Sequence, residues 1–452
     1  MSDSQMLIAS LREYNDLGNC MWCMAKADGT ILYTAGRGWM MWSGTHWRQD
    51  EPGVVRFVSS ELVARASEGV KTQNEQLTKS AFPSATHVKS VVYLLQSHVN
   101  IDVAEFVQVP HHLNFLNGVV DLRTGEIIPH HHSQRQTYCL DSVFEAGAES
   151  PLWEEMISQW IGNDVAMRQY LHRLMGYAVT GETNEESLVY FYGPPRSGKG
   201  TFLNTIHQIL GPLAASTDMD TFMDRKNGRN FALASLIEAR FVQAQETRTD
   251  QWLNTALLKS ATGRDPLSVE QKYKTPYTAI PVWHIFLASN YPPKAPPDDA
   301  AFWETRMRVI SFPNSNSGNE DRTLKSRLLT EENKRGILSW LVRGAMAWYK
   351  HGLGPVPTTV VETTQQMRSL SDSLGRWLSE GCVMDPDAEI ASNLLHTAYS
   401  QWCDDEGVPA GERYPMAELV RRLNMRGLTS RRTTLGGRNG HRTYVVKGIK
   451  LS

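Results

Sequence analysis

The sequence lacks the features that would place the protein in a membrane, outside the cell or in a disulfide-stabilised class. No apolar run approaches the roughly 20 residues that a membrane-spanning helix needs. The N-terminus has no basic segment followed by an apolar one, so a secretory signal is not expected. The five cysteines, Cys20, Cys23, Cys139, Cys382 and Cys403, are scattered and odd in number, which gives no disulfide framework. We therefore expect a protein of the reducing cytoplasm, inside a bacterium or a host cell.

A structural zinc site is not expected either. Cys20 and Cys23 have the C-x-x-C spacing, but no second Cys or His pair accompanies them. Internal repeats and low-complexity segments are also missing. What remains is an ordinary globular composition, 41% hydrophobic and 21% charged.

Segments rich in Gly, Pro and small residues divide the chain into three predicted parts. Residues 1–148 are predicted to form a mixed α+β domain, residues 149–350 an α/β domain, and residues 351–452 a helical connector with a small basic module. In the middle part, apolar strand-like runs alternate with helical ones. This alternation is typical of a mostly parallel sheet with helices on both faces.

The middle part contains the pattern strand, glycine loop, helix. Residues 188–192 are an apolar run typical of a buried strand, and apolar residues recur at helical spacing over 202–210. A G-x-x-x-x-G-K loop between them would direct backbone N–H groups and a helix N-terminus at a polyphosphate. The loop predicts nucleotide binding by Gly193, Pro194, Pro195, Arg196, Ser197, Gly198, Lys199, Gly200 and Thr201.

Within this loop we expect Lys199 to contact the β- and γ-phosphates. Gly200 follows it where Ser or Thr is usual, so we predict that Thr201, one residue later, reaches the magnesium ion directly or through water. Two later strands end in polar residues, Glu246 and Asn290, and ligands of such sheets bind beyond the carboxyl ends of the strands.

We expect Glu246 to polarise the attacking water and to help hold magnesium, and Asn290 to orient the water or sense the γ-phosphate. Gln245 stands where many such enzymes carry a metal-binding Asp. Arg306 follows an acidic, proline-rich loop at 292–299, and this placement suggests an arginine finger supplied to a neighbouring subunit.

Several of these segments together resemble one family. The run from Gly193 through Glu246, residues 259–265 and Asn290 to Arg306 resembles the superfamily III helicases of the phage/plasmid and poxvirus-type primase–helicase family. Residues 117–125 and 176–181 resemble further stretches of that family. No primase catalytic domain is recognisable ahead of the ATPase part, so we expect the helicase part alone, with a separate primase or polymerase supplying primers.

The resemblance implies an AAA+-like P-loop core that uses ATP and Mg²⁺ and assembles as a ring, usually a hexamer. Such a ring moves along single-stranded DNA and unwinds duplex DNA during replication of a phage, plasmid or genomic island. Lys272, Tyr273 and Lys274 match the hairpin that lines the central channel in the family. Two cations around an aromatic ring also suit contact with a DNA strand.

Both flanks carry candidate nucleic-acid contacts. No Asp or Glu occurs after position 420, and the C-terminal module resembles a winged-helix DNA binder. We predict that it contacts DNA through Arg431, Arg432, Arg438 and Arg442. Near the N-terminus, Trp39, Trp42 and Trp47 flank a Ser-Gly turn; they could stack on bases, but tryptophans at strand spacing more often belong to the core.

Two other functions remain open from the sequence. A replication initiator or loader of the AAA+ type would use ATP only as a switch. A nucleotide kinase has a similar glycine loop, but such kinases begin near that loop, whereas here 192 residues precede it.

Overall fold

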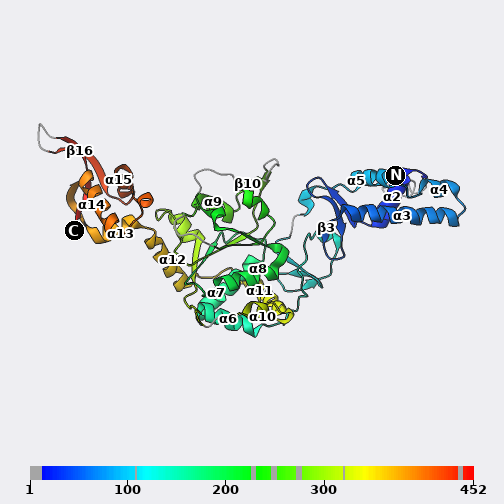
Figure 1. The fold of residues 1–452 in the computed structure, drawn as a ribbon, viewed down its shortest axis with the longest axis horizontal. Helices are drawn as coiled ribbons and strands as arrows, with labels where there is room; N and C mark the ends of the chain where they lie inside the picture. Colours follow the sequence, from blue (N-terminus) through cyan, green and yellow to red (C-terminus); the bar gives the residue numbers. More distant parts are fainter. Residues whose placement is uncertain are drawn as a thin grey trace.

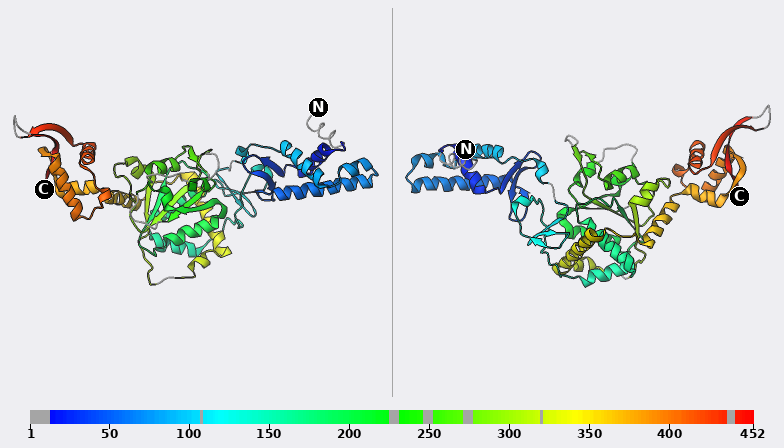
Figure 2. Two further views of the ribbon diagram at one scale, coloured as in Figure 1. Left: turned by 45° about the horizontal axis from the view of Figure 1, so that its top comes forward. Right: turned by 180° about the vertical axis from the view of Figure 1, so that it is seen from behind.

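The computed structural model describes residues 13–106, 109–224, 231–245, 252–270, 277–318, 321–435 and 441–452. It arranges the chain as three parts in a row (Figure 1), and their order is the same when the molecule is turned (Figure 2). Helices and a small sheet lie at the N-terminal end, an α/β domain in the middle and a small module at the C-terminal end. None of the helices in the described ranges combines the length and apolar character that a membrane span requires.

The N-terminal part combines helices with a three-stranded antiparallel sheet, β1-β2-β3. Asn15, Asp50 and Ser84 cap three of its helices with their side-chain oxygens. Cys20 and Cys23 are buried in its hydrophobic core as free thiols. The elements are α2 (Asp16–Ala27), β1 (Ile31–Thr34), β2 (Gly38–Trp42), β3 (Trp47–Gln49), α3 (Glu51–Lys71), α4 (Glu75–Ser80), α5 (Ala85–His98) and the 3-10 turn η1 (Val103–Phe106).

A second antiparallel sheet joins this part to the middle of the molecule. It consists of β4 (His112–Phe115), β5 (Gly118–Asp121) and β6 (Ile127–Ile128), and the 3-10 turn η2 (His132–Gln134) follows. Leu113, Phe115 and Val120 of this sheet belong to the hydrophobic core of the central domain. Arg240, only 2% exposed, links this sheet to the central domain. Its guanidinium donates to the carbonyls of His112 in β4 and of Val179 at 2.8 and 2.9 Å.

The central domain is organised around five parallel strands, which confirms the predicted α/β class. They lie in the order β13-β7-β12-β9-β8. The strands are β7 (Leu188–Tyr192), β8 (Ala214–Asp218), β9 (Phe241–Gln245), β12 (His284–Ser289) and β13 (Met307–Ser311). Val189 and Phe191 of β7 pack into one hydrophobic cluster, whereas Leu188 and Tyr190 pack into the other. Burial on both faces explains why this strand is an unbroken apolar run.

Helices cover both faces of the sheet (Figure 1). One face packs against α6 (Pro151–Ile161), α7 (Val165–Ala178), α8 (Lys199–Leu210) and α11 (Glu331–His351), and the other against α9 (Thr255–Thr262). The other elements are η3 (Gly211–Leu213), η4 (Met219–Phe222), η5 (Phe231–Ser235), the hairpin strands β10 (Leu267–Val269) and β11 (Tyr277–Ala279), the π-helical turn η6 (Phe302–Arg306) and α10 (Leu324–Leu328).

The predicted connector between the central domain and the C-terminal module is helix α12 (Thr358–Leu370). Val360 and Met367 are buried in the hydrophobic clusters of the central domain. In addition, the hydroxyl of Thr364 accepts a hydrogen bond from the backbone N–H of Val309 at 3.1 Å. The helix is therefore packed on the central sheet rather than free.

The C-terminal module has its own hydrophobic core, with Trp377 and Tyr399 almost fully buried. Its three strands form one antiparallel sheet in the order β14-β16-β15. The elements are α13 (Ser373–Gly381), β14 (Cys382–Ala391), α14 (Ser392–Asp405), η7 (Ala410–Glu412), α15 (Met416–Met425), β15 (Thr429–Leu435) and β16 (His441–Leu451).

Candidate functional site

The glycine loop lies at the carboxyl end of β7, directly before α8, as the sequence predicts. Gly198 has φ +94°, and a Cβ there would stand 2.2 Å from Nε1 of Trp160. A Cβ on Gly193 would stand 2.1 Å from the carbonyl oxygen of Phe312. Both positions therefore require glycine. No side chain caps the start of α8, so this helix N-terminus is available to an anion.

Lys199 is 7% exposed and its ammonium is surrounded by oxygen atoms. Nζ donates to the carbonyls of Gly193 and Pro194 at 2.8 and 2.9 Å. It also contacts the Ser197 hydroxyl at 3.1 Å and Oδ1 of Asn290 at 3.0 Å. Burial lowers the pKa of Lys199 to about 8. The structure thus brings together Lys199 and Asn290, two residues 91 positions apart, because β12 pairs directly with β7.

The pocket in front of the loop is polar, and none of its described lining residues is acidic. It is lined by residues 195–201 together with Asn204, Gln245, Ala288, Ser289, Asn290 and Lys325. Asn204 holds the two glutamines of β9, since its Oδ1 accepts from Gln243 at 3.1 Å and Gln245 at 3.4 Å. Thr201, the predicted magnesium ligand, is one of the residues that line the pocket, and Glu246 lies outside the described residues.

This set of groups fits a nucleotide. The glycine loop leaves a cradle that a Cβ would fill, the N-terminus of α8 is uncapped, and Lys199 offers a cation. The Thr201 hydroxyl and the amide oxygens of Asn204 and Gln245 are hard donors of the kind that Mg²⁺ binds directly or through water.

Arg306 lies at the amino end of the parallel strands, whereas the glycine loop lies at their carboxyl end. Arg306 immediately precedes β13, whose Met307 is in parallel register with Leu188 at the start of β7. The glycine loop follows the far end of β7, about 16 Å away for a strand of this length. Arg306 is paired instead with the carboxylate of Glu186 and its side chain is 18% exposed. It therefore does not face the glycine loop of its own chain.

The loop at 292–299, between Asn290 and Arg306, contacts the C-terminal module. Asp298 forms ion pairs with Arg422 and with Arg426, the latter at 3.3 Å. Lys294 pairs with Glu412 at 2.6 Å. Two arginines of the basic C-terminal end are therefore engaged by the central domain.

Other predicted DNA contacts are only partly described. Lys272, Tyr273, Lys274 and Arg438 lie outside the described residues, as does the side chain of Arg442. The strands on either side of 271–276, β10 and β11, pair antiparallel as a hairpin would require.

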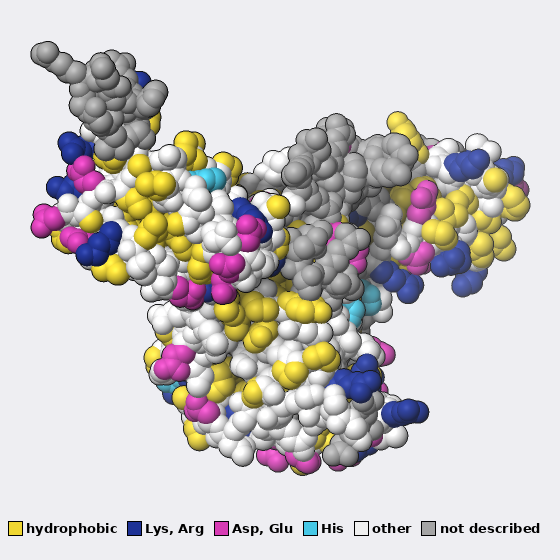
Figure 3. Space-filling model, turned by 60° about the vertical axis from the view of Figure 1, so that its left-hand side comes forward, with side chains coloured by type: hydrophobic (Ala, Val, Ile, Leu, Met, Phe, Trp, Pro, Cys, Tyr) yellow, Lys and Arg dark blue, Asp and Glu magenta, His cyan; other side chains and the backbone are white. Residues whose placement is uncertain are grey.

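Several of the described basic residues of the module are paired with acids. Arg431 pairs with Glu389 at 2.8 Å and Lys450 with Asp385 at 2.8 Å, and Arg432 is exposed. Positive and negative side chains are interspersed over this part of the surface (Figure 3). β14 thus supplies acids that reduce the positive field of the C-terminal end.

The tryptophans near the N-terminus mainly belong to the core. Trp39 and Trp47 are 5% and 0% exposed. Nε1 of Trp47 donates to the carbonyl of His132 at 2.8 Å, and Trp42 packs beside Trp47. Two of the three rings are therefore not available for stacking on bases.

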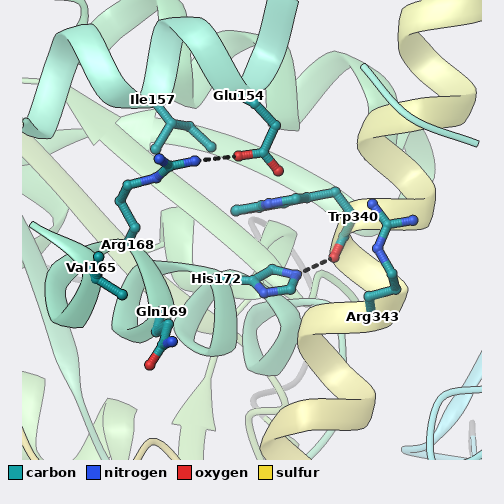
Figure 4. A pocket seen from close by; sticks show the side chains of 8 residues that line it. All are labelled: Glu154, Ile157, Val165, Arg168, Gln169, His172, Trp340 and Arg343. Carbon is teal, nitrogen blue, oxygen red and sulfur yellow. Dashed lines mark hydrogen bonds and ion pairs between the residues drawn. The ribbon is translucent and has the colours of Figure 1, made fainter. Parts of the chain in front are cut away.

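A second pocket lies between α6, α7 and α11 (Figure 4). Its charged groups have partners, because Arg168 pairs with Glu154 at 2.8 Å and Arg343 donates to the Ser339 hydroxyl at 2.7 Å. His172 contacts the carbonyl of Trp340 at 2.8 Å, and burial lowers the pKa of this histidine, so its ring is neutral near pH 7. We interpret the pocket as a packing junction.

One cluster has the composition of a metal site. His111, His112 and Asp121 have ligand atoms within 4.8 Å of one another. However, both carboxylate oxygens of Asp121 accept hydrogen bonds from Arg123, at 3.0 and 2.6 Å. The arginine already supplies the positive charge that a metal would bring.

Comparison with known proteins identifies two matching family models. Residues 12–162 match the family described as D5 N terminal like, and residues 191–306 match a family of unknown function (DUF5906). The second match begins in β7 and ends at Arg306.

Three curated relatives are viral proteins. The chain is 23% identical over 337 residues to "Putative helicase L207/L206" of Acanthamoeba polyphaga mimivirus, covering 66% of this chain and 35% of that protein. It is 22% identical over 284 residues to "Putative helicase 022R" of Frog virus 3 (58% and 29%). It is also 22% identical over 325 residues to "Putative primase C962R" of African swine fever virus (65% and 33%). The chain thus spans about a third of the length of these relatives.

Among solved structures, the chain is similar to the A form apo structure of the NrS-1 C terminal region. The match has a TM-score of 0.41 at 12% identity and covers 68% of this chain and 78% of that one.

Proposed function

We propose that this chain is an ATP-dependent ring helicase of superfamily III that acts in DNA replication, because it is similar to viral proteins named "Putative helicase" and "Putative primase" and its N-terminal part matches the family described as D5 N terminal like. In this proposal the protein binds ATP with Mg²⁺, assembles as a hexameric ring and moves along single-stranded DNA. Duplex DNA is separated as the ring advances, during replication of a mobile element such as a phage, a plasmid or a genomic island.

The observation that carries the proposal is the meeting of Lys199, Asn290 and the uncapped N-terminus of α8 at one edge of the sheet. Phosphate oxygens would replace the carbonyls that now accept from Lys199. Asn290 is then placed to orient a water against the terminal phosphate, and Glu246, next in sequence to Gln245, would polarise that water. Mg²⁺, when bound, would neutralise phosphate charge, and Thr201 is the protein ligand we assign to it.

The position of Arg306 supports assembly into a ring. It lies at the amino end of the strands, opposite the end that carries the glycine loop. It can therefore complete a nucleotide site only in another subunit. In a closed head-to-tail ring, every interface brings Arg306 of one subunit to the nucleotide site of the next.

Two features support contact with DNA. The C-terminal module has the order helix, strand, helix, helix, strand, strand around one antiparallel sheet, which supports a winged-helix assignment. Arg431, Arg432, Arg438 and Arg442 are its proposed phosphate contacts. In the central domain, the hairpin of β10 and β11 would present Lys272, Tyr273 and Lys274 to the strand in the channel.

The test is ATP hydrolysis with and without single-stranded DNA, together with the mass of the protein in the presence of nucleotide. We expect DNA to stimulate hydrolysis, Lys199→Ala to abolish it and the mass to be that of a ring. Replacing Lys272 and Lys274 by Ala should abolish unwinding and spare DNA-independent hydrolysis. Hydrolysis by a monomer that DNA does not affect would contradict the proposal, and unwinding by the double variant would contradict the channel assignment.

A further inference from the structure

A second lysine, which the glycine-loop motif does not include, lines the nucleotide pocket. Lys325 belongs to α10 and faces the same pocket as Ser197, Lys199 and Asn290. Among the described residues it has no hydrogen-bond or ion-pair partner, whereas the Lys199 ammonium has four oxygen neighbours. An unpaired ammonium in a pocket whose described lining lacks acids is suited to bind an anion.

The segment around Lys325 is fixed in place on both sides. Asp321 accepts from the backbone N–H of Thr323 at 2.8 Å and from Nη1 of Arg327 at 2.8 Å, which orders the start of α10. At its other end Leu328 is fully buried in the central core. The backbone thus holds Lys325 at the pocket, and only its side chain must be ordered when a ligand binds.

The preceding chain is also tied to the glycine loop. The Ser315 hydroxyl donates to the carbonyl of Pro195 at 3.0 Å, and the backbone N–H of Asn316 donates to the carbonyl of Arg196 at 3.2 Å. The segment after β13 therefore runs along the loop itself.

The sheet order determines the side from which Lys325 approaches. β12, which ends before Asn290, pairs with β7 on one side, and β13, which leads to α10, pairs with it on the other. If the terminal phosphate of a nucleotide lies at Asn290, the opposite end of its phosphate chain lies toward β13. The chain that leads to Lys325 is on that side, because Ser315 and Asn316 bind the carbonyls of Pro195 and Arg196.

We propose that Lys325 binds the α- and β-phosphates of nucleoside di- and triphosphates, as a second phosphate-binding cation beside Lys199. This proposal rests on the proposed nucleotide site, and it adds a prediction about the affinities of ATP and ADP. Because ATP and ADP share these two phosphates, the contact strengthens the binding of both to the same degree. Lys325 therefore sets how tightly the product is retained as well as how tightly the substrate binds.

The experiment measures the dissociation constants of ADP and of a non-hydrolysable ATP analogue by calorimetry, on the full chain. Lys325→Gln should weaken the binding of both ligands by the same factor, about tenfold for the loss of one charge-assisted contact. Lys325→Arg keeps the charge and should restore most of the affinity. Arg322→Gln removes a charge from the same segment outside the pocket, and should leave both constants unchanged.

The outcomes separate this inference from the proposed function. Unchanged constants in Lys325→Gln, with binding lost in Lys199→Ala, would overturn the role of Lys325 and leave the nucleotide site intact. Weaker binding of the ATP analogue alone would place Lys325 at the γ-phosphate and also overturn the proposal. A wild-type chain that binds neither ligand would overturn both. If Lys325→Gln and Arg322→Gln weaken nucleotide binding equally, the effect comes from the overall charge of the segment and not from a contact of Lys325. This outcome would also overturn the proposal.

Discussion

Nucleotide affinity should fall as the pH rises above 8, because Lys199 must carry a proton to bind phosphate. Burial lowers the pKa of this lysine to about 8 in the free protein, and a bound polyphosphate raises it again. Binding above pH 8 therefore takes up a proton, and the dissociation constant should increase about tenfold per pH unit. Between pH 7 and pH 9 we expect about a tenfold loss, equivalent to about 1.4 kcal/mol.

The assay is calorimetric titration with ADP at pH 7, 8 and 9, in buffers that differ in ionisation enthalpy. The wild-type protein should show proton uptake that grows toward pH 9. The control is Lys199→Arg, whose guanidinium stays charged throughout this range, so its affinity should not depend on pH even if it is weaker. A wild-type affinity that is constant from pH 7 to pH 9, with no proton uptake, would refute the reasoning.

Two further substitutions test the packing around the site. Gly198→Ala combines a left-handed φ of +94° with a Cβ 2.2 Å from the Trp160 ring, so we expect a loss of about 1–3 kcal/mol in unfolding free energy. Gly200→Ala, whose Cβ meets nothing nearer than 3.5 Å in a helix, should be neutral or stabilising in the same denaturation experiment. Asp298→Asn should weaken docking of the C-terminal module by about 1–2 kcal/mol. Faster proteolysis after α12 at low salt would reveal this, and the difference should shrink at high salt.

The local part of the site could be predicted from the sequence because its signals are local. Strand, glycine loop and helix follow one another within residues 188–210, and the polar residue after β12 is recognisable by its position alone. These signals required no knowledge of which strands are neighbours. The parallel sheet was predictable for the same reason, since apolar runs buried on both faces alternate with helices.

The other parts of the site depend on the order of the strands in the sheet, and no local sequence signal reveals that order. Lys325 lies at the pocket only because β13 pairs with β7, and an exposed lysine on a five-residue helix carries no pattern of its own. The pairing of Arg422 with Asp298, 124 positions apart, is likewise a product of tertiary packing. The lack of Asp and Glu after position 420 indicates a DNA surface, but it cannot reveal that part of the positive charge there is paired with an acid of the central domain.

Strand order also leads to the most direct test of the ring. Arg306 precedes β13 and the glycine loop follows β7, so the two lie at opposite ends of neighbouring parallel strands. Lys199→Ala and Arg306→Ala should each be inactive alone, but a mixed ring contains interfaces where an intact loop faces an intact arginine. In a random one-to-one mixture about a quarter of the interfaces are complete, so about a quarter of the wild-type hydrolysis rate should return. If the two variants co-assemble and no activity returns, Arg306 does not act on a neighbouring site, and its pairing with Glu186 is then its structural role.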